Sequence, residues 1–414
     1  MKGRLLFLLR VLKYRFFLHS LKGIQHYRRI LRVRKNGKAN VLFIASNLPM
    51  WKYQGLYELM SQDTRFDASI LIYPFNTYTP EQRSYDAEIL KAFFTSKGIQ
   101  VIDPGENLDV IHDMNPDMIF YPQPYPGLYG NLLEPCNFED RLLCYFPYGL
   151  FTQYTDWAYN TRFHNIAWKL FYPTEYHRKD AGRLAYNGGK NVCIVGEPDA
   201  DYMRAPHKEN PWKNTDCRKR VIWAPHFSIS KNRLMNRDSF MWMSDLMLEI
   251  AEEYADRIQI AFKPHPRLKT ELYLHQDWGK QRTDEYYALW DSMPDTQLET
   301  EGYLDLFSFS DALIHDSGSF SAVYQYTYKP SLFVSDNLPK IKGELSEFGN
   351  RCLDLHYHAN TREAVISFIE NVVLNEEDCR RSERMTFVDE VMMPPGGRTA
   401  AQNAFDEIIR GLGI

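Results

Sequence analysis

The stretch Asp311–Val334 reads DALIHDSGSFSAVYQYTYKPSLFV, and it decides the fold. Its first apolar run ends at a polar turn that begins with Asp316, and a helical pattern over Ser319–Tyr328 leads to a second apolar run at Ser331–Val334. A strand, a helix and a strand in this order form a parallel pair, with the polar turn at the carboxyl end of the first strand. The stretch therefore predicts one unit of a parallel α/β sheet.

The same alternation continues over both halves of the chain. In the first half the expected strands are Asn40–Ser46, Asp67–Tyr73, Gly98–Ile102, Pro116–Pro122, Arg141–Phe146 and Asn191–Gly196. In the second half they are Arg220–Pro225, Ile258–Pro264, Asp311–Asp316 and Ser331–Val334. Helical patterns separate most of these runs, which indicates parallel sheets covered on both faces.

A polar, proline-containing stretch at 198–219 separates the two series, and a chain of 414 residues is long enough for two cores. We expect an α/β protein with two facing, Rossmann-like, doubly wound domains over residues 40–205 and 206–390. A basic arm over 1–39 precedes them, and a C-terminal helix over 391–414 packs back on the first domain. Ligands of such sheets bind at the carboxyl ends of the strands.

The amino-terminal arm concentrates positive charge. Residues 1–40 contain 12 Lys and Arg residues, and no Asp or Glu precedes Glu58. Apolar residues recur at helical spacing, at Leu5, Leu8, Leu9, Leu12 and Phe16. The longest uncharged run is far shorter than the ~20 residues of a membrane-spanning helix.

We therefore expect an amphipathic arm on an anionic membrane surface, and a cytoplasmic protein held peripherally on the inner face of the cell membrane. A helix packed on the protein's own body is the alternative. No nucleic-acid recognition motif accompanies the charge, so we expect no nucleic-acid partner.

Neither a cofactor nor a metal is expected. The six cysteines are scattered without a CxxC pair, which argues against a zinc site and a disulfide framework. No paired-aspartate cluster stands out. Asp199 and Asp201 follow a strand end, where a linker turn is a better interpretation than a metal site.

Basic and hydroxyl side chains follow three expected strands of the second half. They are His226; Lys263, His265 and Arg267; and His315, Asp316, Ser317, Gly318 and Ser319. We expect these strands to be neighbours, so that the side chains converge on one edge of the sheet. Together with the unbonded N–H groups at a helix start, they form a site for the phosphates of a nucleotide diphosphate. An ordinary N-cap by Asp316 or Ser317 is the alternative interpretation.

The order of these segments carries a family resemblance. APHF, FKPHP and SDALIHDSGSFSAVYQYTYKPSLFV resemble the CDP-glycerol glycerophosphotransferases of teichoic-acid and capsule synthesis, well over about Arg220–Val334 and in outline over the whole chain. The resemblance implies a GT-B fold with an acceptor-side first domain and a nucleotide-donor second domain. It matches His265 to the family's histidine after the second strand. It also matches a donor-phosphate segment and a Lys-Pro pair, at Asp316, Ser317, Ser319 and Lys329-Pro330.

This sequence also departs from the family pattern. His315 stands in place of Thr, Ser317-Gly318 in place of Tyr-Ser, and His226 where Thr is usual. The strand end YFPYG, Tyr145–Gly149, replaces a segment that carries a histidine in many members, and Tyr148 is the nearest counterpart. A phenol with an ordinary pKa of about 10 is a poor base at neutral pH, so the identity of the general base stays open.

The resemblance implies transfer of glycerol phosphate, or a related polyol phosphate, from a CDP-linked donor such as CDP-glycerol to a hydroxyl of a lipid-linked glycan, with release of CMP. The implied catalytic residues are His265, Asp316 and Tyr148. The implied donor-binding residues are His226, Lys263, Arg267, His315, Ser317, Gly318 and Ser319. An imidazole such as that of His265 could deprotonate the acceptor or protonate the leaving phosphate.

Two other functions stay open. HDSG, His315–Gly318, also resembles the phosphate-side segment of UDP-N-acetylglucosamine 2-epimerases, which favours a GT-B sugar transferase or epimerase with a UDP-linked sugar. A catalytically silent membrane-associated binding module is the third interpretation, because Tyr148 stands where a histidine is usual. In the first half, we expect Asn160, His164, Asn165 and Trp168 to pack as part of a helix, with contact to an acceptor as the alternative.

Overall fold

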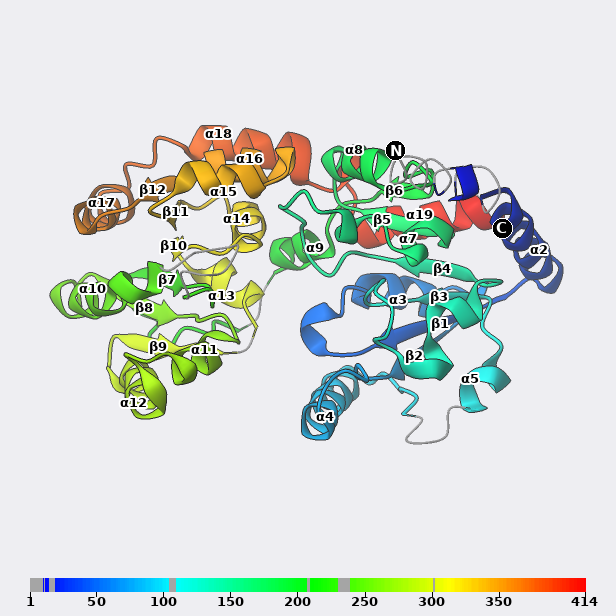
Figure 1. The fold of residues 1–414 in the computed structure, drawn as a ribbon, viewed down its shortest axis with the longest axis horizontal. Coiled ribbons are helices and arrows are strands. Elements are labelled where there is room, and N and C mark those ends of the chain that lie inside the picture. Colours follow the sequence, from blue (N-terminus) through cyan, green and yellow to red (C-terminus); the bar gives the residue numbers. More distant parts are fainter. Residues whose placement is uncertain are drawn as a thin grey trace, which may run out of the picture. The chain divides into compact units, whose positions relative to one another are not determined.

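The structure is a computed structural model that describes residues 10, 12–14, 19–103, 109–206, 209–229, 239–300 and 302–414. The chain forms two compact units (Figure 1). Unit 1 consists of Met1–Phe151, Thr155–Asp201 and Met392–Ile414, and unit 2 consists of Thr152–Tyr154 and Tyr202–Val391. Most of the apolar residues expected at helical spacing in the arm, Leu5, Leu8, Leu9 and Phe16, lie outside the described residues.

Unit 1 is built on a parallel six-stranded sheet in the order β2-β1-β3-β4-β5-β6. The strands are β1 (Ala39–Ala45), β2 (Phe66–Ile72), β3 (Met118–Phe120), β4 (Leu142–Tyr145), β5 (Lys169–Tyr172) and β6 (Val192–Ile194). The helices between them include α3 (Gln54–Gln62), α4 (Pro80–Ser96), α5 (Asp109–Met114), α7 (Arg162–Ile166), α8 (Glu175–Leu184) and α9 (Pro198–Arg204). Stacked rings of Phe43 and Phe120, with centroids 4.4 Å apart, join β1 to β3 in the core.

One expected strand of unit 1 is wrong. Gly98–Ile102 contributes only an isolated bridge between Ile102 and Leu71 of β2. Gly98 has a φ of 68°, in the left-handed region, and its N–H bonds to Thr95 O near the end of α4. The first part of the segment therefore belongs to the helix terminus, and too few residues remain to form a ladder.

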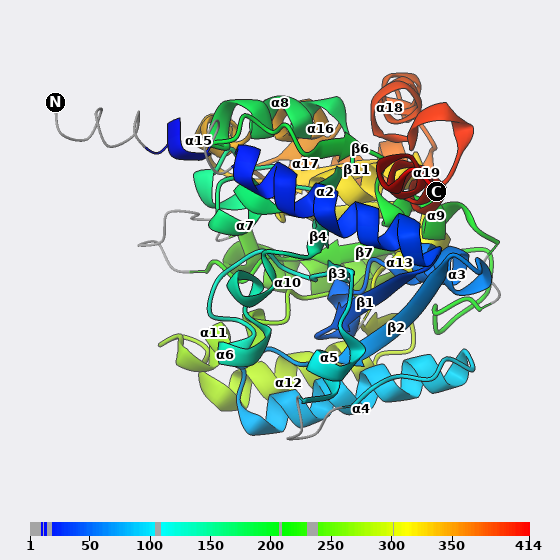
Figure 2. The ribbon, with the colours of Figure 1, turned by 90° about the vertical axis from the view of Figure 1, so that its right-hand side faces the viewer.

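Two helices from distant parts of the chain complete unit 1. α2 (His19–Asn36) buries Ile30 and Val33, and α19 (Ala400–Leu412) buries Ala404 and Ile408. α19 packs against α3 and α2, and α2 also contacts α7 (Figure 2). Within the ranges that the structure describes, no helix is both long enough and apolar enough to cross a membrane.

Unit 2 repeats the architecture with a parallel sheet in the order β12-β11-β10-β7-β8-β9. Its strands are β7 (Lys219–Ala224), β8 (Ile258–Phe262), β9 (Thr296–Leu298), β10 (Ala312–His315), β11 (Ser331–Val334) and β12 (Tyr357–Ala359). Its helices include α10 (Ser239–Glu253), α11 (Leu268–Leu274), α12 (Gly279–Ser292), α13 (Leu304–Phe309), α15 (Leu338–Glu344), α16 (Glu347–Asp354), α17 (Arg362–Ser367) and α18 (Arg381–Phe387). The two outer strands were not expected, because three-residue strands with polar members give no apolar run.

The helix expected over Ser319–Tyr328 is also shorter than the sequence predicts. α14 (Phe320–Val323) has four residues, and a 3₁₀ helix, η5 (Tyr324–Thr327), follows it. Tyr328 then adopts a left-handed φ of 60°. Tyr324, Gln325 and Tyr326 are all buried, so the segment is covered on more than one side, and packing rather than an amphipathic face determines its shape.

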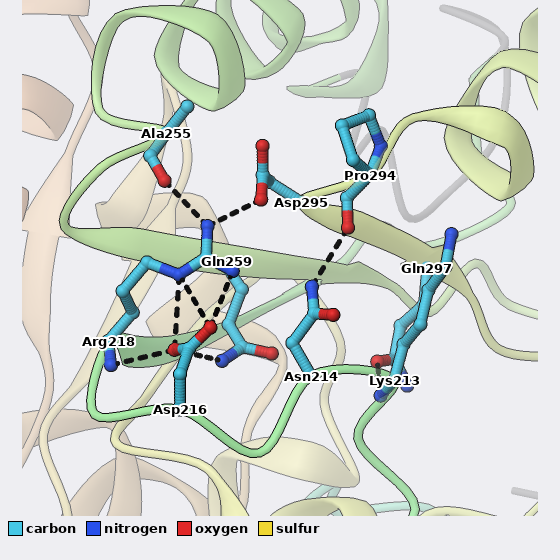
Figure 3. A network of polar contacts seen from close by, with 9 residues as sticks. All are labelled: Lys213, Asn214, Asp216, Arg218, Ala255, Gln259, Pro294, Asp295 and Gln297. Atoms are coloured by element: carbon cyan, nitrogen blue, oxygen red, sulfur yellow. Dashed lines mark hydrogen bonds and ion pairs between the residues drawn. The ribbon is translucent and has the colours of Figure 1, made fainter.

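A polar network closes the amino end of the unit 2 sheet (Figure 3). Arg218, which precedes β7, donates to the carboxylate of Asp216 and to Ala255 O at 2.6 Å, and it forms an ion pair with Asp295 before β9. Asn214 donates to Pro294 O at 2.8 Å. This end of the sheet is therefore closed by internal pairs, and the residues predicted to bind a ligand lie at the opposite, carboxyl end.

Candidate functional site

The carboxyl ends of β10, β7 and β8 bring the predicted segments together. β7 pairs directly with β10 on one side and with β8 on the other. The prediction that these three strands are neighbours is confirmed. Residues 226, 263–267 and 315–319 consequently follow adjacent strands at one edge of a single sheet.

Aromatic and imidazole rings join two of these strand ends. The ring centroids of His226 and His265 lie 5.2 Å apart, and the Phe227 ring lies 4.3 Å from His226 and 4.5 Å from His265. The guanidinium of Arg267 stacks over the Phe227 ring at 4.2 Å. The edge thus carries two imidazoles and a cation around one phenyl ring.

The same backbone turn orients all three histidines at the strand ends. His226 Nδ1 accepts from Ser228 N at 3.2 Å, and His265 Nδ1 accepts from Arg267 N at 3.1 Å. In His315, the Nδ1 atom accepts from Ser317 N at 3.1 Å. A backbone N–H can only donate, so each neutral imidazole carries its proton on Nε2.

His265 is a neutral hydrogen-bond donor at physiological pH. Burial, with help from the positive charges of Arg267 and Lys263, lowers its pKa from 6.5 to about 4. Its Nδ1 lone pair is already used by Arg267 N–H, which leaves Nε2–H as the group that can reach a ligand. Sequence reasoning expected an acid or a base here, whereas this geometry favours stabilisation of a negative charge by Nε2–H.

Asp316 is turned into the protein. Its side chain is 1% exposed, and its two carboxylate oxygens accept from His226 N and from Ser239 Oγ, each at 2.6 Å. These bonds tie the end of β10 to the end of β7 and to the start of α10. The predicted catalytic role of Asp316 therefore needs revision, because both oxygens hold protein donors and the carboxylate positions His226.

The side chain of His315 is likewise turned inward, contrary to its predicted contact with donor phosphate. It is 1% exposed, and its Nε2 lies 3.0 Å from Nε2 of His356, a residue that sequence reasoning did not single out. With Nδ1 bonded to Ser317 N, both ring nitrogens are engaged within the protein.

The turn after β10 offers hydroxyls rather than a helix terminus. Ser317 Oγ and Ser319 Oγ lie 3.4 Å apart; Ser317 is only 9% exposed, whereas Ser319 is exposed. Gly318 O accepts from Ser321 Oγ at 2.5 Å and from Thr152 Oγ1 at 3.2 Å. Because α14 has only four residues and no side-chain cap, the predicted phosphate site at a helix dipole loses its basis, and the alternative, an N-cap by Asp316 or Ser317, is not formed either.

The two cations after β8 differ in exposure. Lys263 is 5% exposed, and its Nζ lies 3.4 Å from Glu299 O beyond β9. The Arg267 side chain is 58% exposed and pairs with Glu271 at 3.0 Å. Arg267 is therefore the cation that a ligand can reach, while Lys263 contributes charge from below the surface.

The Lys-Pro pair named by the resemblance serves the fold. Lys329 Nζ donates to Ser308 O at 2.6 Å and to Phe307 O at 3.2 Å, and burial lowers its pKa to about 8. It thereby satisfies carbonyls at the end of α13.

Unit 1 presents tyrosines at its carboxyl edge. Tyr148 is partly buried with its ring edge-on to Phe151, and burial raises its pKa, which makes it a poorer base than an exposed phenol. The hydroxyls of Tyr125, Tyr145 and Tyr172 are buried and have no hydrogen-bond partner among the described residues. Tyr145 and Tyr172 are the last residues of β4 and β5.

The residues around α7 pack, as expected. His164 is 0% exposed, and its Nδ1 and the Thr161 hydroxyl complete a capping box at the start of the helix. Asn165 donates to Thr161 O at 2.8 Å and accepts from Asn187 N at 2.8 Å. These bonds hold both side chains in the packing around α7, while Nε2 of His164 is buried without a hydrogen-bond partner among the described residues.

The acidic residues near the end of β6 also have structural partners. They lie in and before a helix, α9, rather than in the expected linker turn. Lys52 pairs with Asp199 and lies 3.5 Å from Glu197, whose pKa burial raises to about 8. Asp201 accepts from Ala400 N at 2.9 Å and so caps α19. Over the described part of the chain, no cluster of three or more His, Cys, Asp or Glu residues could hold a metal.

No family model and no curated protein sequence matches this chain. Solved structures do match, and they define the class of fold. Two parallel six-stranded sheets with flanking helices make a GT-B-like α/β protein, and the predicted fold class is confirmed.

Three of the similar structures illustrate the likeness. Staphylococcus aureus MnaA with UDP is 15% identical, with a TM-score of 0.56 over 91% of this chain and 97% of that one. The Neisseria meningitidis UDP-GlcNAc 2-epimerase bound to UDP-GlcNAc is 15% identical, with a TM-score of 0.56 over 90% and 100%. The wall teichoic acid polymerase TagF is 12% identical, with a TM-score of 0.57 over 100% and 98%. At these identities the likeness shows the fold.

Proposed function

We propose that this protein is a transferase that moves glycerol phosphate, or a related polyol phosphate, from a CDP-linked donor to a hydroxyl of a lipid-linked cell-envelope glycan and releases CMP. The observation that carries the proposal is the set of donors at the carboxyl edge of unit 2. It comprises the Nε2–H of His265, the exposed guanidinium of Arg267 and the hydroxyls of Ser317 and Ser319. Oxygens of a diphosphate need such a set of donors.

The proposed reaction asks the protein mainly for positioning and for neutralisation of charge. The acceptor oxygen attacks the β-phosphorus, the bond from that phosphorus to the bridging oxygen breaks, and CMP leaves with the electron pair. His265 Nε2–H and Arg267 donate to phosphate oxygens as charge moves onto the leaving group. The acceptor proton passes to a base that this set does not include, because Nδ1 of His265 is occupied.

In this proposal unit 2 binds the donor and unit 1 binds the acceptor. Tyr148, which is only partly buried at the carboxyl edge of unit 1, offers a hydroxyl and a flat apolar face, which suit a polyol or a sugar. No cofactor and no metal enter the reaction.

A second candidate is an enzyme that acts on a UDP-linked sugar. It is supported by the solved UDP-GlcNAc 2-epimerases, whose TM-scores of 0.56 nearly equal the 0.57 of TagF. Both candidates place a nucleoside diphosphate at the same edge of unit 2, so the donor distinguishes them.

The test offers CDP-glycerol and UDP-GlcNAc separately to the full-length protein, with and without a lipid-linked glycan acceptor. The proposal expects CMP release from CDP-glycerol that depends on acceptor, and tighter binding of CDP than of UDP. Epimerisation of UDP-GlcNAc or release of UDP would support the second candidate instead. Nucleotide binding without release of any product would indicate a binding module. Arg267→Ala should weaken binding of the nucleotide donor, whereas Arg257→Ala, which removes an exposed cation elsewhere in unit 2, should not.

We also propose that the protein works at an anionic membrane surface on the cytoplasmic side, where its lipid-linked acceptor lies. On α2, Lys22 and Arg29 face the body of unit 1 and pair with Glu139 and Asp117 at 2.9 and 3.2 Å. Apolar side chains are exposed instead, at Leu21 (42%), Ile24 (52%), Tyr27 (57%) and Leu31 (43%). Arg28 and Lys35 are exposed on the same helix, which suits contact with anionic lipid.

Sedimentation with vesicles tests this contact. Binding to vesicles that contain phosphatidylglycerol should exceed binding to vesicles of phosphatidylcholine alone. Ile24→Glu should weaken binding to the anionic vesicles, whereas Ile89→Glu on α4 should not. Equal binding to both kinds of vesicle would contradict the electrostatic part of the proposal.

A further inference from the structure

Two buried histidines form a directed chain of hydrogen bonds behind the candidate site. His315 is 1% exposed and His356 is 0% exposed, and their Nε2 atoms are 3.0 Å apart. His356 Nδ1 lies 2.9 Å from Cys352 O in the last turn of α16, and His315 Nδ1 lies 3.1 Å from Ser317 N. The chain therefore runs from α16 to the turn after β10.

The partners fix every proton in this chain. A carbonyl can only accept, so Nδ1 of His356 carries a proton and its Nε2 is bare. A backbone N–H can only donate, so Nδ1 of His315 is bare and its Nε2 carries the proton. The one arrangement of two neutral rings that satisfies all three contacts has His315 Nε2–H donating to His356 Nε2.

The chain ends at a residue of the candidate donor site. Ser317 follows His315 by two residues, and its hydroxyl lies 3.4 Å from that of Ser319. A bond to Ser317 N–H fixes the peptide that carries this hydroxyl. His226 and His265 make the same bond at their own turns, and at His315 the buried His356 also contacts Nε2 of the ring.

We propose that His356 is a positioning residue for the donor site: through His315 it fixes the turn that presents the Ser317 and Ser319 hydroxyls to donor phosphate. The proposal rests on the proposed function of that site. His356 does not touch substrate in this view. It determines which nitrogen of His315 is bare and available to Ser317 N–H.

Substitution of His356 tests the chain. His356→Phe removes the acceptor that His356 provides for His315 Nε2–H, while His356→Gln keeps an acceptor oxygen at the end of the side chain. Donor contacts of Ser317 exist before and during reaction, so their loss raises KM more than it lowers kcat. We expect donor KM to rise about tenfold in His356→Phe with kcat within about twofold, and His356→Gln to restore KM to within about threefold of wild type.

The matched control is the exposed His358, which lies in β12, two residues after His356. His358→Gln should leave KM unchanged. Equal KM in wild type and His356→Phe would overturn the proposal, as would equal losses in the Phe and Gln variants. If no donor is turned over, the dissociation constants of CDP and UDP replace KM, and a tenfold weakening confined to His356→Phe still supports positioning.

Nitrogen NMR of the wild-type protein with ¹⁵N-labelled histidine tests the chain through the protonated nitrogen of each ring, independently of any kinetic measurement. The proposal requires the Nε2–H form for His315 and the Nδ1–H form for His356, assigned with the His315→Gln and His356→Gln spectra. An Nδ1–H form of His315, or a doubly protonated ring at neutral pH, would overturn it whether or not the transferase activity is found.

Discussion

The two units share a parallel six-stranded sheet, but they treat polar side chains at its carboxyl edge differently. In unit 2, Asp316 and His315 are buried in hydrogen bonds to the protein, and the backbone bond to Nδ1 of His265 leaves the proton of that ring on Nε2. In unit 1, the hydroxyls of Tyr145 and Tyr172 are buried with no partner among the described residues. The same backbone architecture thus supports a pre-organised edge in one unit and an unsatisfied one in the other, and side chains alone make the difference.

The largest effect should come from His265, at the carboxyl end of the unit 2 sheet. His265→Ala should lower kcat/KM by about 10²–10³, the cost of removing one donor to a developing negative charge. His265→Gln should lose much less, because its amide N–H can replace Nε2–H, whereas a general base could not be replaced by Gln. Steady-state kinetics of the two variants distinguish these roles. His275→Ala is the control, because His275 Nδ1 also accepts from the backbone N–H two residues later, Asp277 N, away from the site. Equal losses in Ala and Gln variants would restore the interpretation of His265 as a base.

The buried Asp316, at the same end of the sheet, should affect the free energy of unfolding. Asp316→Ala leaves His226 N–H and the Ser239 hydroxyl without an acceptor, and we expect the free energy of unfolding to fall by about 3 kcal/mol. Urea denaturation measures this change. Asp245→Ala, on the exposed face of α10, should change stability by less than about 0.5 kcal/mol. A loss for Asp316→Ala no larger than this control would show that the network does not hold the edge.

Unit 1 contains a buried charge cluster of Lys52, Glu197 and Asp199. We expect its contribution to stability to depend on pH. Burial raises the pKa of Glu197 from 4.5 to about 8, so the folded protein keeps a proton that the unfolded chain has lost. Stability should therefore fall as pH rises between these values, by about 1.4 kcal/mol per pH unit. Glu197→Gln lacks this dependence, and its stability relative to wild type should grow by about 2 kcal/mol from pH 6 to pH 7.5.

Denaturation of both proteins at several pH values checks the Glu197 prediction. Glu407→Gln is the control, because the pairing of Glu407 with Lys169 keeps its pKa below 4.5, outside this range. Parallel stability curves for wild type and Glu197→Gln would mean that Glu197 is ionised in the folded state and fully paired with Lys52.

The smallest effect tests the unit 1 tyrosines directly. Tyr145→Phe and Tyr172→Phe remove hydroxyls that have no partner, so each should leave stability unchanged or raise it by up to about 1 kcal/mol. Tyr129→Phe, which loses bonds to Gln123 N and O at 2.9 and 2.7 Å, should cost about 1–2 kcal/mol. Thermal unfolding of the three variants compares them. A clear loss for Tyr145→Phe would show that water or a ligand satisfies its hydroxyl.

Much of the fold could be predicted, because buried parallel strands leave unbroken apolar runs. The strand ending at His315 and the strand Ser331–Val334 are where the sequence places them, and three polar segments meet because their strands are adjacent. The short outer strands β9 and β12 could not be found, since Thr296–Leu298 and Tyr357–Ala359 are too short and too polar for a period to appear.

The direction of the site's side chains could not be predicted, because their partners are distant in sequence. Asp316 turns inward to reach Ser239, 77 residues earlier, and His315 turns inward to reach His356, 41 residues later. The signal for His356 was faint: His356 and His358 alternate around Tyr357, as inward and outward residues of a strand do. Only the buried member of the pair matters for the site.

The return of the chain to unit 1 has a consequence for biosynthesis. Met392–Ile414 belongs to unit 1, and α19 supplies Ala404, Ile408 and Leu412 to its core. Ribosomes release the amino-terminal part first, and domains usually fold in that order. Here unit 2 is nearly continuous in sequence and can fold before unit 1, because the core of unit 1 is complete only once α19 has been made. During synthesis, the amino-terminal part of unit 1 should therefore need the protection of chaperones for longer than unit 2.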